Sequence, residues 1–346
     1  MIRLECDYAE GAHPRVLRRL TDTNFDQTVG YGEDTFCDKA RAQVRALCGG
    51  GEDLSVHFLV GGTQVNTTVI AAALRPHQGV IAAHTGHINV HETGAIESTG
   101  HKVLPIPSED GKLTAAAILA LWRAHWTDAT HEHMVQPAMV YLSQPTENGT
   151  LYSLEELDAI WQVCQSKGLI LYIDGARLGY GLMSKACDMT LPDLAIRCDA
   201  FTIGGTKQGL LFGEALVLRN RALNRDFRYL IKQRGGLLAK GRLLGVQFSA
   251  ILEEELYFTL SRQADEFAMK IRRAFEAKGC PMLYDSYTNQ QYPILPDKLL
   301  HELEREFAFA FWCKTDETHT AVRICTSWAT TQRAVDTLLR RLKQFA

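Results

Sequence analysis

The feature that most constrains the fold is an alternation of short apolar runs with helical patterns between about residue 36 and residue 218. The runs of strand length lie at 54–60, 79–84, 102–107, 138–144, 169–174, 200–205 and 214–218. Most of them are apolar throughout, as expected for strands that are buried on both faces of a sheet. The alternation therefore predicts a mainly parallel, seven-stranded sheet that is covered by helices.

The helix before the run at 169–174 has clear start and stop signals. Ser153 and Glu156 have the spacing of a capping box, and Gly168 suits the position that follows a helix end. We therefore predict a helix over the segment LEELDAIWQVCQSK.

The pattern changes after about residue 226. A long helical stretch runs to Lys278, and short strands mixed with helices follow it, the last helix spanning residues 330–345. We therefore expect an α/β chain with a large domain over residues 15–230 and a smaller α+β domain over residues 231–346, which residues 1–14 join.

Composition and charge narrow the class of protein. The 346 residues are 46% hydrophobic, and the net charge of -3 gives no reason to expect nucleic acid or an anionic membrane as the main partner. The nine cysteines contain no CxxC pair, which favours a reducing compartment over a disulfide framework. The segment MIRLECDYAEG lacks the apolar stretch of a signal peptide, and no apolar run approaches the roughly 18 residues of a membrane span. We expect a cytoplasmic protein whose partner is a small molecule.

Two polar residues follow buried runs, where ligands bind in open α/β sheets. Asp174 ends the run LILYID, and Lys207 follows AFTIGG in a glycine-rich loop. Taken alone, Asp174 could belong to a solvent-exposed turn, and Lys207 could be a surface lysine. Together they supply an amine nucleophile and a carboxylate for a ring nitrogen, which is what a Schiff-base cofactor needs.

The turn after the first run contains Gly61, Gly62, Thr63 and Gln64 and leads into a helical pattern. Glycines let the backbone approach a ligand, and the first amides of a helix bind anions. The turn is no Walker loop, because no Gly-Lys-Ser/Thr follows. It is a candidate anion site, and a simple tight turn is the alternative.

The segment HTGHINVHETG contains His84, His87, His91 and Glu92. His87 and His91 are one helical turn apart, which suggests a metal-dependent hydrolase as an alternative from another class. The segment does not match HExxH, and no further ligand completes an obvious zinc set. Packing or capping roles, or a position facing a cofactor, are the competing interpretations.

These features together resemble the pyridoxal-phosphate enzymes of aminotransferase fold type I, and within them the threonine aldolase and β-eliminating lyase family, low-specificity L-threonine aldolases in particular. The motifs that carry the resemblance are YGED (31–34), GGTQVN (61–66), HINVHETGA (87–95), SQPTENGTLYSLEEL (143–157), DGARLGYG (174–181), GGTKQG (204–209) and, more weakly, VRICTSW (322–328). They span most of the expected large domain in the family's order.

The resemblance implies roles around pyridoxal 5'-phosphate. Lys207 would form the covalent link to the cofactor, Asp174 would keep its ring nitrogen protonated, and His87 would stack on the ring. The residues implied to bind the phosphate are Gly62, Thr63, Gln64 and Thr206.

The resemblance also implies how a substrate is held. Arg177 and Arg323 match the arginines that bind the substrate carboxylate, a role suited to a planar fork of donors. Tyr31 resembles the family's active-site tyrosine, and Cys6 stands where the family often has a serine that helps to bind the carboxylate. His133 is a second candidate catalytic histidine, with a surface position as the alternative.

The expected function is that of an aldehyde-lyase that cleaves β-hydroxy-α-amino acids such as threonine or allo-threonine to glycine and an aldehyde. The base would be His87 or His133. β-Elimination or transamination of another amino acid is the alternative within the same cofactor class, since pocket geometry decides which bond breaks. The family's active sites are shared between subunits, which implies a homodimer or homotetramer in which Lys240 or Arg242 reaches a neighbour's phosphate.

Overall fold

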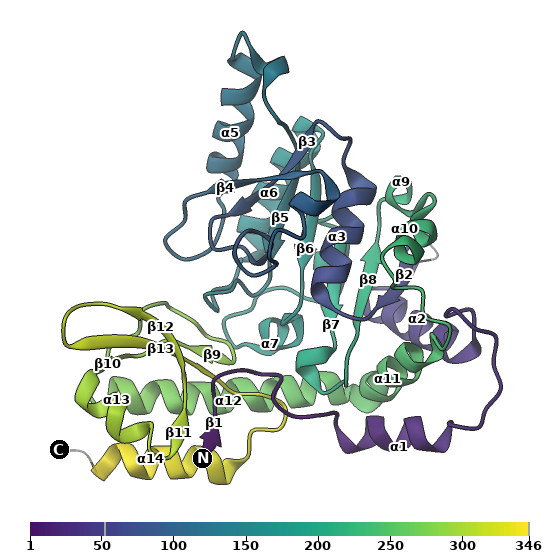
Figure 1. The fold of residues 1–346 in the computed structure, drawn as a ribbon. Helices are drawn as coiled ribbons and strands as arrows, with labels where there is room; N and C mark the ends of the chain where they lie inside the picture. The colour runs from purple at the N-terminus through teal and green to yellow at the C-terminus, as the bar shows by residue number, and fades with distance from the viewer. Residues whose placement is uncertain (52, 345–346) are drawn as a thin grey trace.

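The computed structural model describes residues 1–51 and 53–344, and these form a two-part α/β architecture (Figure 1). The large part is built on a seven-stranded sheet in the order β2-β8-β7-β6-β5-β3-β4. Its strands are β2 (Ser55–Leu59), β3 (Gln78–Ala83), β4 (Lys102–Ile106), β5 (Gln136–Ser143), β6 (Ile170–Asp174), β7 (Ala200–Gly204) and β8 (Glu214–Leu218). Each coincides with one of the apolar runs, so the seven predicted strands are confirmed.

The sheet is mainly parallel, as predicted. Strands β7, β6, β5, β3 and β4 run parallel to one another, whereas β8 is antiparallel to both β7 and β2. The reversal occurs because β7 and β8 are joined by a short glycine-rich connection that holds Lys207, with no crossover helix between them. This connection therefore lies at the carboxyl end of β7.

Helices cover both faces of the sheet (Figure 1). The helices of the large part are α1 (Pro14–Asp22), α2 (Thr35–Leu47), α3 (Gly62–Ala73), α4 (His87–Val90), α5 (Ala115–Thr127), α6 (Leu154–Lys167), α7 (Leu178–Met183), α8 (Leu191–Ala195), α9 (Arg221–Asn224), α10 (Phe227–Gln233) and α11 (Arg242–Leu252), of which α1 packs against α11. Neighbouring strand residues point to opposite faces, so Leu171 packs with α6 and Tyr172 packs with α3. Both faces are apolar, which explains why most runs lack a polar alternation.

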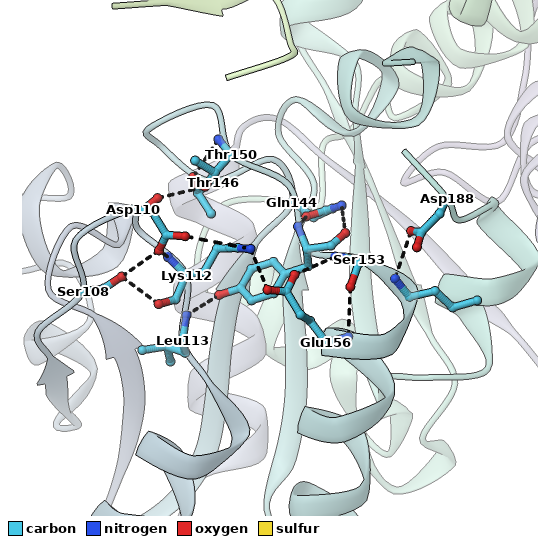
Figure 2. A network of polar contacts seen from close by, with 12 residues as sticks. Ser108, Asp110, Lys112, Leu113, Gln144, Thr146, Thr150, Ser153, Glu156 and Asp188 are labelled. Atoms are coloured by element: carbon cyan, nitrogen blue, oxygen red, sulfur yellow. Dashed lines mark hydrogen bonds and ion pairs between the residues drawn. The ribbon is translucent and has the colours of Figure 1, made fainter. Parts of the chain in front are cut away.

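The start of α6 forms the capping box that its sequence predicts, at the centre of a polar network (Figure 2). Ser153 Oγ accepts a hydrogen bond from the Glu156 amide at 3.1 Å, and Glu156 Oε2 accepts one from the Ser153 amide at 2.8 Å. Lys112 adds an ion pair to Glu156 Oε1 at 2.6 Å. Gly168 ends the helix with a φ of 66°, in the left-handed region that favours glycine.

The smaller part contains a sheet in the order β10-β13-β12, with β9 also paired to β13. Its elements are α12 (Leu256–Glu276), β9 (Gln290–Gln291), β10 (Ile294–Pro296), α13 (Asp297–Leu303), β11 (Phe307–Ala308), β12 (Ala310–Lys314), β13 (His319–Cys325) and α14 (Gln332–Gln344). Strand β1 (Ile2–Arg3) pairs in parallel with β11, so the start of the chain lies against this part. The last residue of the helix predicted at 330–345 lies outside the described residues.

The long helix α12 contributes side chains to two different apolar clusters. Residues up to Leu260 pack with the large sheet, while Leu4 and residues from Phe267 onward pack with the small one. The domain boundary expected at residue 230 stays a prediction. No helix among the described residues is long and apolar enough to cross a membrane.

Candidate active site

A cavity of about 220 Å³ lies at the carboxyl ends of β5, β6 and β7. The site forms here because parallel strands end on the same edge of the sheet, and Ser143 at the end of β5 is in register with Asp174 at the end of β6. The lining residues are Val60, Gly61, Gly62, Thr63, His87, Ser143, Pro145, Glu147, Asp174, Ala176, Arg177, Thr206, Lys207 and Glu214.

Asp174 is held rigidly in this cavity. Its Oδ2 accepts hydrogen bonds from Tyr141 Oη at 2.8 Å and from Asn66 Nδ2 at 3.1 Å, and its Oδ1 accepts one from the Ala176 amide at 2.9 Å. The residue is only 6% exposed. These three donors fix the orientation of the Asp174 carboxyl group at the end of β6.

His87 is the first residue of α4 and is oriented by two carboxylates. Its Nδ1 lies 2.8 Å from Glu92 Oε1, and its backbone amide donates to Glu147 Oε1 at 2.8 Å. Burial opposes the charged imidazole, but the hydrogen bond to Glu92 and the charges of Asp174 and Glu92 raise the pKa of His87 above its ordinary value. Because Nδ1 is anchored, Nε2 is the ring nitrogen left to act on a ligand.

Lys207 lies in the short helical turn η3 (Thr206–Gln208) after β7 and lines the cavity. Burial and the charge of Arg177 lower the pKa of Lys207, while Asp7, Glu214 and Asp174 act in the opposite direction. A lowered pKa increases the fraction of neutral amine, which is the nucleophilic form.

The glycines before Lys207 are required by close packing. A Cβ at Gly204 would lie 2.3 Å from the carbonyl oxygen of Ala176, inside any allowed contact. The glycine therefore lets the end of β7 approach the turn that carries Arg177, and this approach brings Lys207 and Arg177 into one cavity.

Arg177 is positioned by a carboxylate from the far end of the chain. Its Nε and Nη2 donate to the two oxygens of Asp7 at 2.7 and 2.9 Å, and Asn289 Nδ2 donates to the same carboxylate at 2.9 Å. Burial would raise the pKa of Asp7, but the charges of Arg177 and Lys207 and these hydrogen bonds lower it to about 2. Asp7 is therefore ionised and fixes the plane of the guanidinium group that lines the cavity.

The turn between β2 and α3 opens into the cavity through Gly61, Gly62 and Thr63. Gly61 is the N-cap of α3 and has no side chain to cap the helix, so the first-turn amides are available to an anion. The Gln64 side chain points elsewhere: its Oε1 accepts from the Val60 amide and its Nε2 donates to the Arg234 carbonyl, each at 3.0 Å. Only the backbone of Gln64 could serve an anion here.

Two residues from the sequence-based set lie outside the cavity. His133 is in the turn before β5, whereas the cavity lies at the other end of that eight-residue strand, roughly 25 Å away at about 3.3 Å per residue. Its side chain is exposed and does not line the cavity of its own chain, and a catalytic role for His133 stays a prediction. Tyr31 is 45% exposed and lines a separate small cavity.

Arg323 and Cys6 lie near the cavity without lining it. Arg323 Nη2 donates to the Glu5 carbonyl at 3.1 Å. Arg323 and Arg177 both contribute to lowering the pKa of His91, after burial and His87, so the two guanidinium groups face the same region. Cys6 is half-buried and directly precedes Asp7.

The three histidines do not form one ligand set: the His87 and His91 rings lie 5.6 Å apart between centroids, whereas His84 has a separate partner. His84 Nδ1 accepts a hydrogen bond from the Ser108 amide at 3.1 Å, while His87 is anchored on Glu92. Across residues 1–51 and 53–344, no group of three or more His, Cys, Asp or Glu side chains is arranged to hold a metal ion. The donor set of a metal-dependent hydrolase is therefore not assembled from His84, His87 and His91.

Sequence reasoning missed three carboxylates of this region: Asp7, Glu147 and Glu214. Glu147 accepts hydrogen bonds from Ser143 Oγ at 2.7 Å and from the His87 amide, and burial raises its pKa. Two of them had a usable signal. Glu147 lies inside the SQPTENGT motif, and Glu214 opens the otherwise apolar run EALVL. The signal for Asp7 was only its position next to Cys6, and its contact with Arg177 arises only through the tertiary fold.

The groups that line the cavity fit pyridoxal phosphate. Lys207 offers an amine with a lowered pKa, and Asp174 offers a carboxyl group of fixed orientation. The turn at Gly61 offers the first amides of α3, which no side chain caps. These are the groups that an aldehyde, a ring nitrogen and a phosphate require.

Comparison with known proteins agrees with this reading of the site. The family model for beta-eliminating lyases matches residues 9–297. A low specificity L-threonine aldolase from Pseudomonas aeruginosa is 30% identical over 342 residues, which cover 97% of this chain and 96% of that protein. A Leishmania major threonine aldolase structure superposes with a TM-score of 0.96 at 41% identity, covering 99% of both chains.

More distant structures share the fold alone. A Thermus thermophilus aspartate aminotransferase superposes with a TM-score of 0.70 at 12% identity, covering 99% of this chain and 90% of the other. The aminotransferase fold expected from the sequence is therefore confirmed. With the family model matching most of its length and close relatives aligned from end to end, this chain belongs to the beta-eliminating lyase family.

Proposed function

We propose that this protein is a pyridoxal-phosphate-dependent aldehyde-lyase that cleaves β-hydroxy-α-amino acids of the threonine type to glycine and an aldehyde. The observation that carries the proposal is the meeting of Lys207, Asp174, Arg177 and His87 in one cavity. The threonine aldolases of Pseudomonas aeruginosa and Leishmania major, aligned over almost the whole chain, support the choice of reaction.

The cofactor would be held at three points. Lys207 would provide its covalent attachment, Asp174 would pair with its ring nitrogen, and the backbone of Gly62 and Thr63, with Thr206, would bind its phosphate. When bound, the cofactor supplies an electron sink for the pair of electrons released by the Cα–Cβ bond. His87 would lie against its ring.

The protein's own residues would orient the substrate and move its proton. Asp7 fixes the plane of Arg177, so this guanidinium would bind the substrate carboxylate in one orientation, with Arg323 as a second donor. His87 Nε2 would take the proton of the β-hydroxyl group, since Nδ1 is occupied by Glu92. The neutral imidazole is the base, and its population increases with pH.

A neighbouring subunit would complete the assembly, as a homodimer or homotetramer. Arg242 is engaged within its own chain, because its Nη1 and Nη2 donate to the carbonyls of Asp26 and Asn24 at 2.9 and 3.1 Å. Lys240 is exposed. Lys240 is therefore the better candidate to reach a neighbour's phosphate.

Product analysis tests the proposed reaction. Purified protein supplied with pyridoxal phosphate is incubated with L-threonine, L-allo-threonine and L-serine in separate reactions, with Lys207→Ala protein as the control. Glycine and an aldehyde in equal amounts are expected. A 2-oxo acid with ammonia would instead assign β-elimination, and an amino-group exchange with added 2-oxo acid would assign transamination.

A further inference from the structure

Glu147 is a carboxyl group in the cavity to which the proposed reaction gives no role. It is half-buried and lines the cavity together with His87, Arg177 and Lys207. It lies in the connection between β5 and α6, four residues after Ser143 at the end of β5. A side chain at this edge of a parallel sheet faces the ligand that the cavity binds.

The backbone around Glu147 is fixed by two hydrogen bonds. The Thr146 amide donates to the Thr150 carbonyl at 3.0 Å, which closes a turn around Glu147, and the two threonines lie side by side in Figure 2. Tyr292, which comes from the smaller part of the molecule, donates from Oη to the Glu147 carbonyl at 2.5 Å. The side chain of Glu147 therefore extends into the cavity from a defined position.

One oxygen of the Glu147 side chain has two donors, and the other has none. Oε1 accepts hydrogen bonds from Ser143 Oγ at 2.7 Å and from the His87 amide at 2.8 Å. Oε2 has no hydrogen-bond partner of normal geometry among residues 1–51 and 53–344, and it is not one of the buried polar atoms. Oε2 is therefore the atom through which Glu147 can bind a ligand.

The surroundings of Glu147 favour its protonated form. Burial raises the pKa of Glu147 above its ordinary value, and so does the charge of Asp174, although its hydrogen-bond donors act in the opposite direction. Burial, and to a smaller extent the charge of Glu147, raises the pKa of three neighbouring phenols, Tyr141, Tyr152 and Tyr292. Because Oε1 accepts two hydrogen bonds, the proton of the carboxyl group belongs on Oε2, from which it can be donated.

The place of Glu147 beside His87 identifies the part of the substrate that it meets. In the proposed function Arg177 binds the substrate carboxylate, and His87 Nε2 takes the proton of the β-hydroxyl group. The hydroxyl group therefore lies on the His87 side of the cavity, where the amide of this same residue holds Glu147. An acid that donates to the hydroxyl oxygen leaves the hydroxyl proton free to point at the imidazole.

We propose that Glu147 is a specificity-determining residue that donates a hydrogen bond from Oε2 to the β-hydroxyl oxygen of the substrate. The assignment rests on the proposed function, because it takes a β-hydroxy-α-amino acid as the ligand. The bond selects such amino acids over analogues that lack only the hydroxyl group, since these would leave the carboxyl group unpaired in the cavity. It also strengthens as the hydroxyl proton leaves, because negative charge then develops on the oxygen.

Binding of stable cofactor–amino acid conjugates tests this contact without any turnover. The two probes are N-(5'-phosphopyridoxyl)-L-threonine and N-(5'-phosphopyridoxyl)-L-2-aminobutyrate, which differ only by the hydroxyl group. Each is titrated calorimetrically into full-length protein freed of cofactor. The natural protein is expected to bind the threonine conjugate about tenfold more tightly, as one buried hydrogen bond provides.

Two substitutions separate the donor from the shape of the side chain. Glu147→Gln can keep its oxygen on the Ser143 and His87 donors while its amide nitrogen donates to the hydroxyl group, so the affinity ratio should persist. Glu147→Met has no donor, so the two conjugates should bind equally. Because the ratio compares two ligands of one protein, a displaced His87 would weaken both and leave the ratio unaffected. Glu155→Met, at an exposed position in the first turn of α6, is the matched control and should keep the natural ratio.

Equal affinities for the two conjugates in the natural protein, or an unchanged ratio in folded Glu147→Met protein, would overturn the proposal. Loss of the ratio in Glu147→Gln would contradict the donor role as well, since that variant retains a donor. A protein that prefers the threonine conjugate but releases no glycine from threonine would retain the contact and lose the proposed reaction.

Discussion

Asp7 shows how a single residue far from the cavity in sequence can define its geometry. It is fully buried and holds Arg177 through two hydrogen bonds, while Asn289 from the smaller part of the molecule donates a third. A carboxylate from one end of the chain thus connects Arg177, which lines the cavity, to the smaller part of the molecule.

Replacing Asp7 by asparagine is expected to destabilise the protein in a pH-dependent way. Breaking a buried ion pair from one side costs about 3–5 kcal/mol at neutral pH. The pKa of Asp7 is lowered from 3.8 to about 2, so its contribution is fully present above about pH 4 and is lost as the pH falls through 2. Between these limits the natural protein should lose about 2 kcal/mol of unfolding free energy from this group, and Asp7→Asn should not.

Urea unfolding at several pH values between neutrality and about pH 2 measures this difference. Asp38→Asn, which breaks an ion pair whose carboxylate is 68% exposed, is the control and should cost at most about 1 kcal/mol. Parallel stability curves for the natural protein and Asp7→Asn would contradict the assigned role of Asp7.

The sequence indicates individual residues when local pattern and chemistry coincide. Asp174 ends a buried strand, and Lys207 follows another. Because ligands bind at the carboxyl ends of such strands, the sequence alone predicted both residues at the cavity. Asp7 and Tyr31 do not lie at the end of a predicted strand. Asp7 reaches the site through its contact with Arg177, a residue 170 positions away in the sequence. Tyr31 belongs to the YGED motif of the family resemblance but lies outside the cavity of its own chain.

At the scale of elements, local signals set the ends of α6. The capping box of Ser153 and Glu156 satisfies two amides at the start of this helix, which packs on the sheet beside β6. Ser153→Ala is expected to lower the unfolding free energy by about 1 kcal/mol, because one first-turn amide loses its acceptor. Chemical denaturation at neutral pH measures the change.

Ser166→Ala provides the matched control on the same helix. Ser166 is near the end of α6, where its exposed hydroxyl group donates a hydrogen bond to the Val163 carbonyl. Its replacement should change stability by less than about 0.5 kcal/mol. Equal losses in the two variants would show that the capping box does not stabilise α6.

The seven strands could be predicted because both faces of the large sheet are apolar. The direction of each strand could be predicted only in part. The antiparallel β8 follows β7 after a connection too short for a crossover helix, a topological consequence that apolar content does not encode. The position of His133 was also not predictable from apolar content. His133 lies at the start of β5, whereas the cavity lies at the end of this strand.

At the scale of the whole molecule, an apolar loop predicts self-association. Phe25 and Val29 are 93% and 68% exposed in the segment between α1 and α2, next to Tyr31. Exposed apolar groups that cluster in one segment indicate an interface. Phe25→Glu is expected to shift the sedimentation coefficient from that of a dimer or tetramer towards that of a monomer.

Ile196→Glu is the control for this experiment. Ile196 is 57% exposed and precedes β7, at the end of the sheet opposite the cavity. It should leave the sedimentation coefficient unchanged. A natural protein that sediments as a monomer at every concentration would remove the shared-site proposal.

The central claim is a covalent attachment at Lys207, and borohydride reduction tests it most directly. Protein supplied with pyridoxal phosphate is reduced, digested and mapped by mass spectrometry, with Lys207→Ala protein treated in parallel. A pyridoxyl phosphate group on Lys207, and none on the corresponding peptide of the variant, is the result expected from the cavity that this lysine shares with Asp174. A group on a different lysine, or on none, would contradict the account.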